Sequence, residues 1–153
     1  WKDIPLKHNK TKIDFPEFSL KSGITVNMGN PHIVFFIEDL DKVDMNKIGP
    51  KIEHNSLFPE RINVEICQIL DKNKIRSKIW ERGVGLTLAC GSGACAVLVA
   101  ACKEKLTGNK AKVLLDGGSL EICWNYSSDN HVIMSGPTSV SFLGDFSSLG
   151  DMK

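Results

Sequence analysis

The apolar run at residues 94–102 constrains the fold more than any other feature of this sequence, because it contains no polar residue. The pattern from Gly93 to Leu106 predicts a helix, and roughly two of its turns have no polar face. A helix that is apolar all round has to be buried all round. The rest of the chain must therefore wrap around this helix, and the small side chains of the run suit close contact with surrounding backbone.

Strand patterns fill most of the remaining chain. One of them, Ile33 to Ile37, is continuously apolar, which is typical of a strand buried on both faces, whereas in another Ile62 and Val64 alternate with Asn63. Residues 44–55 form a weaker helical pattern, which Pro50 is expected to break or restart. The sequence predicts an α+β fold, a curled mixed or antiparallel sheet wrapped around one buried central helix. The expected strands are 25–28, 33–38, 61–70, 75–81, 112–115, 119–124, 132–135 and 140–143.

Length and charge exclude several classes of protein. A chain of 153 residues, 42% of them hydrophobic, fits one domain with a proper core. The formal net charge of +1 provides no electrostatic footprint for nucleic acid or for an acidic membrane surface. The sequence shows neither an apolar stretch of membrane-spanning length nor a signal peptide.

The five cysteines indicate the chemical setting. Their odd number, without CxxC pairs or a Cys/His pattern at zinc-ligand spacing, argues against a disulfide framework and against a structural metal site. A reducing, cytosolic setting fits better. Because most free cysteines are packing groups, Cys67, Cys95, Cys102 and Cys123 are expected to pack in the core.

Cys90 is the exception, and it is the candidate reactive residue. It stands directly before the predicted helix, in a turn of small residues that includes Gly91 and Gly93. A thiol at a helix N-terminus meets unpaired N–H groups and the positive end of the dipole, which lower its pKa. The two glycines let the backbone approach a bound anion closely. This segment predicts a reactive thiol beside an anion site of carboxylate size.

Two other polar clusters allow more than one interpretation. Asn30 precedes a proline and His32 opens a buried strand, so they form either a ligand-binding turn or a simple Asn-Pro turn, and spacing alone favours the simple turn. Glu81 and Arg82 are either a surface pair of little energetic consequence or binding groups for the ammonium and carboxylate of an amino acid. Asn63 by itself carries almost no signal.

The chain resembles the C-terminal half of the diaminopimelate epimerases on motifs spread almost from end to end. Leu86 departs from the family, which usually has Glu there, and Ser92 stands where Thr is commoner. The segment that contains Glu81-Arg82-Gly83 and Cys90-Gly91 is the most specific of these motifs. The motifs are residues 28–32, 48–50, 52–53, 58–64, 80–96, 117–118 and 135–137.

The resemblance implies a reaction without cofactor or metal, in which two thiols face each other across the substrate α-carbon. One thiolate removes the α-proton while the other thiol donates a proton to the opposite face. Cys90 would be one thiol, and His32 and Glu81 would tune the thiols. The substrate, diaminopimelate, would be bound by Asn30, Asn63, Glu81, Arg82, Gly91 and Ser92.

The resemblance also implies a missing half, because the family's first domain carries the second thiol. Residues 1–18 would then be a lead-in from that N-terminal domain, 19–138 the C-terminal domain, and 139–153 a last strand and tail that pack on the missing domain. Phe142 would take part in forming a homodimer of the full-length protein. The protein would be cytoplasmic, and the fragment alone would be inactive. The alternatives are another amino-acid racemase or isomerase of the same superfamily, or a non-catalytic ligand-binding or assembly domain.

Overall fold

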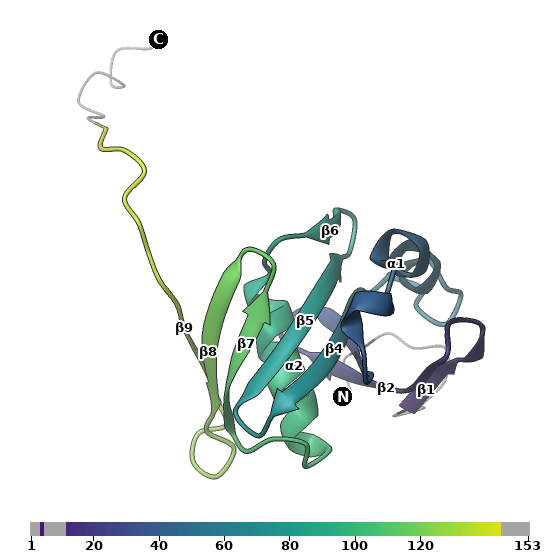
Figure 1. Ribbon diagram of the computed structural model, residues 1–153, viewed down its shortest axis with the longest axis horizontal. Helices are drawn as coiled ribbons and strands as arrows, with labels where there is room; N and C mark the ends of the chain where they lie inside the picture. The colour runs from purple at the N-terminus through teal and green to yellow at the C-terminus, as the bar shows by residue number, and fades with distance from the viewer. Residues whose placement is uncertain (1–3, 5–11, 145–153) are drawn as a thin grey trace.

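Nine strands and two α-helices make up the part of the chain described by the computed structural model, which covers Ile4 and residues 12–144 (Figure 1). Two short 3₁₀ segments, η1 (Pro16–Phe18) and η2 (Leu40–Lys42), connect some of them. The helices are α1 (Met45–Glu53) and α2 (Gly91–Lys103). The strands are β1 (Lys12–Phe15), β2 (Leu20–Asn27), β3 (Pro31–Phe36), β4 (Asn63–Asp71), β5 (Lys74–Glu81), β6 (Gly85–Thr87), β7 (Lys110–Leu115), β8 (Gly118–Trp124) and β9 (Val132–Ser135).

All nine strands belong to one mixed sheet in the order β1-β2-β3-β4-β5-β7-β8-β9. The short strand β6 pairs with the C-terminal end of β5, on the side of β5 that faces away from β4. Neighbouring strands are antiparallel except for the pairs β3/β4 and β5/β7, which are parallel. A parallel pair needs a crossover connection, and each of these two crossovers contains an α-helix, α1 in the first and α2 in the second. The predicted α+β class and mixed sheet are confirmed.

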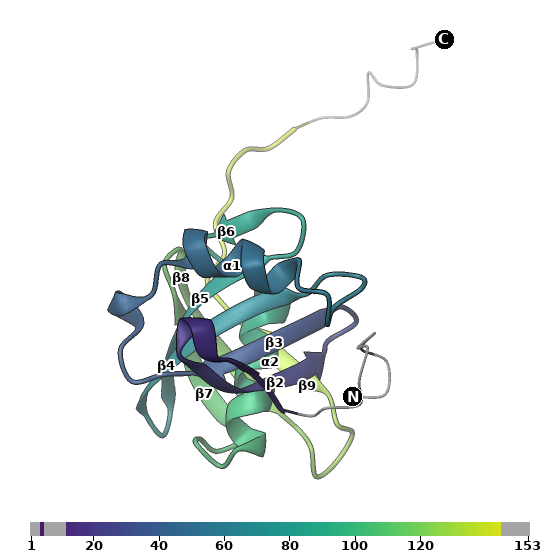
Figure 2. The same cartoon turned by 90° about the vertical axis from the view of Figure 1, so that its right-hand side faces the viewer.

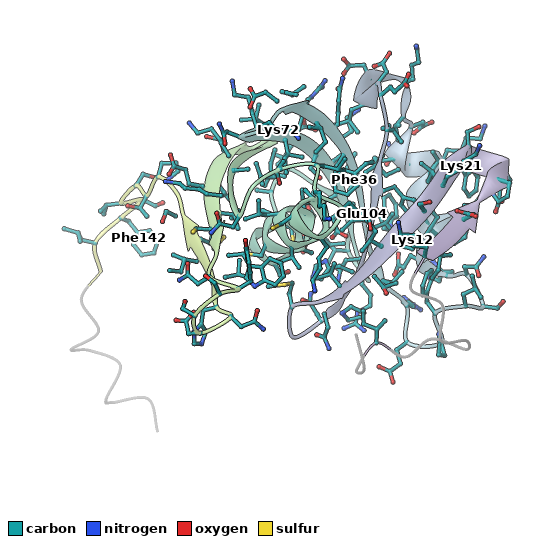
Figure 3. All side chains as sticks on the ribbon, turned by 90° about the horizontal axis from the view of Figure 1, so that it is seen from below. Lys12, Lys21, Phe36, Lys72, Glu104 and Phe142 are labelled. Carbon is teal, nitrogen blue, oxygen red and sulfur yellow. The ribbon has the colours of Figure 1, made fainter. Side chains whose placement is uncertain are left out.

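The helix α2 lies in the centre of the curled sheet, as its composition requires. Seen nearly end-on, it is surrounded by strands, with Phe36 labelled beside it (Figure 3). It contacts β2, β3, β4, β5, β7, β8 and β9. Its buried residues run without a break from Gly93 to Ala101, and they form the inner core with side chains of the surrounding strands.

A second core, the outer core, lies on the opposite face of β3 and β4, where α1 packs against β4 and β5 (Figure 2). Ile33 and Phe35 from β3 pack there with Val64 and Ile66 from β4. The strands β3 and β4 are therefore buried on both faces. It follows that the polar face of β4, which holds Asn63, points toward α2 rather than toward solvent.

The helix α1 continues through Pro50, so the predicted break at this residue is wrong. A proline ring normally clashes with the Cβ of the residue before it when that residue is helical. Here the preceding residue is Gly49, which has no Cβ. Asp44 caps the helix through its carboxylate, which accepts from the N–H of Asn46, and burial of Ile52 anchors the other end. Packing and a tolerant neighbour outweigh the lost hydrogen bond.

The two ends of the described chain differ from the sequence prediction. Lys12–Phe15, expected in the lead-in, pairs with β2, and Phe15 is buried in the outer core. The strand predicted at 140–143 is wrong, because residues 136–144 contain no strand and project from the domain (Figure 1). A strand needs backbone partners, and the described chain offers none there. Residues 1–3, 5–11 and 145–153 of the predicted lead-in and tail lie outside the described residues.

All five cysteines are free. Cys67 and Cys95 are buried in the inner core as predicted, and Cys102 packs against it while half-buried. Cys123 does not, since it lies on the face of β8 opposite to Ile122 and reaches toward the carbonyl oxygen of the Asn125 side chain. The core prediction for Cys123 is wrong, because the outer face of β8 is not covered by a second layer.

Candidate active site

Four elements converge at one end of the sheet, where α2 begins. His32 stands at the start of β3 and Asn63 at the start of the parallel strand β4, and the two residues are register partners. Glu81 is the last residue of β5, which runs antiparallel to β4, so Glu81 lies at the same end of the sheet as Asn63. Cys90 immediately precedes α2. The topology therefore brings together residues that lie far apart in the sequence.

Cys90 is the N-cap of α2, as its position before the helix predicts. Its backbone is extended, with φ −144° and ψ 116°, and its Sγ accepts a hydrogen bond from the N–H of Gly93 at 3.4 Å. The hydroxyl of Ser92 lies 3.5 Å from the same sulfur. The residue Cys90 is only 8% exposed. These two donors are placed to stabilise a thiolate at the helix N-terminus.

The predicted lowering of the Cys90 pKa is nevertheless wrong for this structure. Burial raises the pKa of the thiol, because a thiolate loses solvation there, and the hydrogen bonds from Ser92 and Gly93 offset this only in part. The charge of nearby Glu81 raises the pKa further. Burial also raises the pKa of Cys67, Cys95 and Cys102.

A line of hydrogen bonds leads from the buried side chain of Glu65 to Cys90. The carboxylate Oε1 of Glu65 lies 2.6 Å from Nδ1 of His32, and Nε2 of His32 lies 2.9 Å from Oδ1 of Asn30. The Asn30 amide donates to the hydroxyl of Ser92 at 3.4 Å. Ser92 in turn contacts the Cys90 sulfur. The structure thus connects four of the predicted site residues through one path, which starts at a glutamate that the sequence did not single out.

Asn63 and Arg82 form a second group. The Asn63 amide donates to the carbonyl of Pro31 at 2.7 Å, and its oxygen accepts from the backbone N–H of Arg82 at 2.9 Å. The Arg82 guanidinium donates to the carbonyl of Glu60 at 3.0 Å. Asn63 therefore fixes the turn that carries Arg82 next to the turn that carries Asn30.

Glu53 is a residue of this end of the molecule whose importance the sequence analysis did not recognise. Its carboxylate accepts from Nε1 of Trp80 at 2.7 Å and from the N–H of Gly83 at 2.8 Å. Burial works against the charge, but these two donors, with His54 and Arg61, hold the pKa of Glu53 below its usual value. One sequence signal could have pointed to Glu53: it stands at the end of an amphipathic helical pattern, directly after the apolar residue Ile52 that faces the core.

The predicted site residues therefore gather at one end of the sheet, with the exception of Phe142. Gly91, the first residue of α2, lies against Met134, and a Cβ at Gly91 would meet the Met134 sulfur at 3.1 Å. Phe142 stands apart on the projecting segment and is 82% exposed (Figure 3). Within the described residues, no group of His, Cys, Asp and Glu is arranged to hold a metal ion, and no helix is long and apolar enough to cross a membrane.

Comparison with known proteins gives a consistent result. The family model for diaminopimelate epimerase matches residues 24–141. The diaminopimelate epimerase of Rhodospirillum centenum is 47% identical over 149 residues, 96% of this chain and 50% of that protein. The diaminopimelate epimerase of Methylocella silvestris is 54% identical over 123 residues, 80% of this chain and 42% of that protein. The chain spans about half the length of the curated relatives it matches.

Among solved structures, the chain is similar to a PhzF-family phenazine biosynthesis protein of Bacillus anthracis. The TM-score is 0.49 and the sequence identity 17%, with 71% of this chain and 34% of the other covered.

Proposed function

The chain belongs to the diaminopimelate epimerase family, and we propose that it is the C-terminal half of an enzyme that interconverts LL- and meso-2,6-diaminopimelate. Relatives of that name match nearly all of this chain but only about half of their own length. The observation that carries the proposal is Cys90, which caps α2 by accepting from the N–H of Gly93 and lies in contact with the Ser92 hydroxyl.

The proposed reaction moves one proton off the α-carbon and one proton onto it. A thiolate on one side takes the α-proton and becomes a thiol, while a thiol on the other side gives up its proton to the opposite face and becomes a thiolate. Inversion by this route needs two thiols on opposite faces of the carbon. In the described residues Cys90 alone combines a helix N-terminus with hydroxyl and amide donors, so the second thiol belongs to the half of the protein that precedes this one.

We assign the remaining predicted residues by their chemistry. Arg82 supplies a guanidinium suited to a substrate carboxylate, and Glu81 a carboxylate suited to a substrate ammonium. Glu81 also acts on the Cys90 thiol, whose pKa its charge raises. The binding surface is completed by Asn30, Asn63, Gly91 and Ser92. His32 supports this surface through its contact with the Asn30 side chain. No cofactor or metal takes part in this proposal.

The partners follow from the same proposal. The N-terminal domain would close the site over the substrate, with residues 1–18 leading in from it and 139–153 packing on it beyond the domain of residues 19–138. Val140, Phe142 and Leu143 are 80%, 82% and 92% exposed, which fits a segment that is covered in the whole protein. We propose that the full-length enzyme is a homodimer of the cytoplasm with Phe142 at an interface.

Complementation tests the proposal. The chain alone should not epimerise diaminopimelate, whereas mixing it with the first domain of a full-length relative should restore epimerisation. Cys90→Ala should abolish the restored activity, and Cys102→Ala, which changes a half-buried cysteine at the other end of α2, should leave it within about twofold. Restored activity that survives Cys90→Ala would overturn the proposal.

A further inference from the structure

His32 and Glu65 form a buried pair that the proposed reaction does not by itself explain. They lie on the neighbouring parallel strands β3 and β4, and both are 0% exposed. The 2.6 Å contact joins Nδ1 of His32 to Oε1 of Glu65. The other carboxylate oxygen, Oε2 of Glu65, is buried without a hydrogen-bond partner among the described residues. A carboxylate in such a place is costly when it carries an uncompensated charge.

The contacts of His32 determine where its protons are. Nε2 faces Oδ1 of Asn30 at 2.9 Å, and an amide oxygen only accepts, so Nε2 carries a proton. The 2.6 Å bridge between Nδ1 and Oε1 is a hydrogen bond and therefore contains one more proton. Whether that proton sits on the nitrogen or on the oxygen, the His32–Glu65 pair as a whole has no net charge.

The opposite orientation of the Asn30 amide is disfavoured by the same burial. It would turn the NH₂ group toward Nε2, which would then have to accept, and the only proton of the ring would move to Nδ1. Glu65 would then be either a carboxylate beside a neutral imidazole, which is a net negative charge in a site with no exposure, or a carboxylic acid protonated on Oε2, whose hydroxyl has no acceptor among the described residues. The neutral pair avoids this cost.

We propose that Glu65 is a positioning residue, whose bridge to His32 keeps Nε2 protonated and so fixes the Asn30 amide with its NH₂ group toward Ser92. His32 then donates a hydrogen bond at Nε2 and does not act as a base there. Asn30 offers a donor to whatever occupies the site, which suits a ligand acceptor such as an amino-acid carboxylate. This last step rests on the proposed function, whereas the protonation pattern does not.

Gly93 supports this assignment, because α2 approaches the pair closely at this residue. A Cβ at Gly93 would lie 3.1 Å from Oε1 of Glu65 and 2.7 Å from Cδ1 of Ile79. The start of the helix is thus seated directly on the bridged oxygen. One glycine lets the thiol-bearing turn and the buried pair sit together.

Nitrogen-15 NMR of the histidine rings in the 153-residue chain tests the protonation pattern directly. The His32 signals are identified by their loss in His32→Gln. We expect a proton on Nε2 at neutral pH, detected through its one-bond coupling to that nitrogen. An Nε2 without a proton at neutral pH would overturn the proposal, and it would leave the proposed epimerase function untouched because no substrate is present.

Two substitutions separate positioning from simple filling of space. Glu65→Gln keeps a polar partner, since its amide donates to Nδ1, and should retain the protonated Nε2. Glu65→Leu removes the partner and should lose the single protonation form, with both ring nitrogens exchanging a proton. Glu121→Gln, at an exposed position of β8, is the matched control and should change nothing. Identical His32 spectra for Glu65→Leu and wild type would overturn the proposal, and should Glu65→Leu fail to fold, Glu65→Gln and the wild-type spectrum still test it.

Discussion

Glu53 and Glu65 are both buried carboxylates, but Glu53 ends α1 beside the outer core, whereas Glu65 lies on β4 and faces α2. Glu53 is 2% exposed and accepts hydrogen bonds from Trp80 and Gly83, with the Arg61 guanidinium 3.6 Å away. Glu65 is 0% exposed, and among the residues that the structure describes His32 is its only side-chain partner and one of its oxygens has none.

The pKa of each carboxyl follows from these partners. Burial raises the pKa of Glu65, and the neighbouring His32 offsets this only in part. For Glu53 the donors outweigh burial, and the pKa is lowered. One carboxylate therefore stays charged and clamps the turn that carries Arg82, whereas the other shares a proton and positions a histidine. Burial alone does not decide whether a buried carboxyl has a raised or a lowered pKa, because the hydrogen-bond donors around it also contribute.

Replacing each acid by its amide should separate the two most strongly. Glu53→Gln turns an NH₂ group toward either Trp80 or Gly83, which are both donors, and removes the charge that Arg61 faces. We expect a loss of about 2–3 kcal/mol in the free energy of unfolding. Glu65→Gln should cost less than about 1 kcal/mol, because the glutamine N–H can form the hydrogen bond to Nδ1 of His32 that the shared proton forms in the wild type. Urea unfolding of both variants measures this, and equal losses would contradict the comparison.

The close packing around the Glu53 clamp provides the next test. A Cβ at Gly49 would enter the indole ring of Trp80, whose Nε1 is held by Glu53. We expect Gly49→Ala to destabilise the chain by about 1–3 kcal/mol through overpacking, although alanine is the better helix former. Gly108→Ala, where a Cβ meets nothing within 4 Å, is the control. A neutral Gly49→Ala in thermal unfolding would show that Trp80 is free to move.

The pH dependence of stability should have opposite signs for the two acids. The lowered pKa of Glu53 gives a contribution that is present above the unfolded value of about 4.3 and is lost as the pH falls through the folded value. The raised pKa of Glu65 gives one that is complete below about 4.3 and is lost as the pH rises toward the folded value. The advantage of wild type over Glu53→Gln should therefore shrink in acid, and that over Glu65→Gln should shrink toward neutral pH. Parallel trends would contradict this account.

A smaller effect is expected at Cys90, which a third acid influences. Ser92→Ala removes a donor to the sulfur and should raise the pKa of Cys90, whereas Glu81→Gln removes a nearby negative charge and should lower it. The rate of alkylation at Cys90 as a function of pH, read by mass spectrometry, gives both values. Shifts in the same direction for the two variants would contradict the assigned contacts.

The sequence predicted the centre of the fold better than its edges. The apolar run in α2 left few alternatives, because a helix without a polar face has to be surrounded. The same argument does not say which face of β4 points inward, since that depends on the outer core, where Val64 and Ile66 pack. In the structure the face with Asn63 and Glu65 points toward α2, and its polar residues need partners there. Neither residue is solvated, and both are hydrogen-bonded.

Other features were beyond reach of the sequence for physical reasons. Pro50 continues a helix only because Gly49 tolerates it and Ile52 is buried, which is a tertiary effect. The strand expected at 140–143 depends on partners that the described chain does not contain. The pKa of Cys90 depends on a competition between burial and donors, and a sequence shows the donors but not the burial.

Exchange of the α-hydrogen of diaminopimelate with deuterated water tests the central claim, that this chain holds one of two opposed acid–base groups. The chain alone should give neither exchange nor inversion, because the opposing thiol is absent and a site open to water loses the low-dielectric surroundings that strengthen its electrostatics. Adding the first domain of a full-length relative should produce both, with inversion dependent on Cys90. Efficient inversion with deuterium uptake by the 153-residue chain alone would contradict the claim, since it would require a second base within these residues.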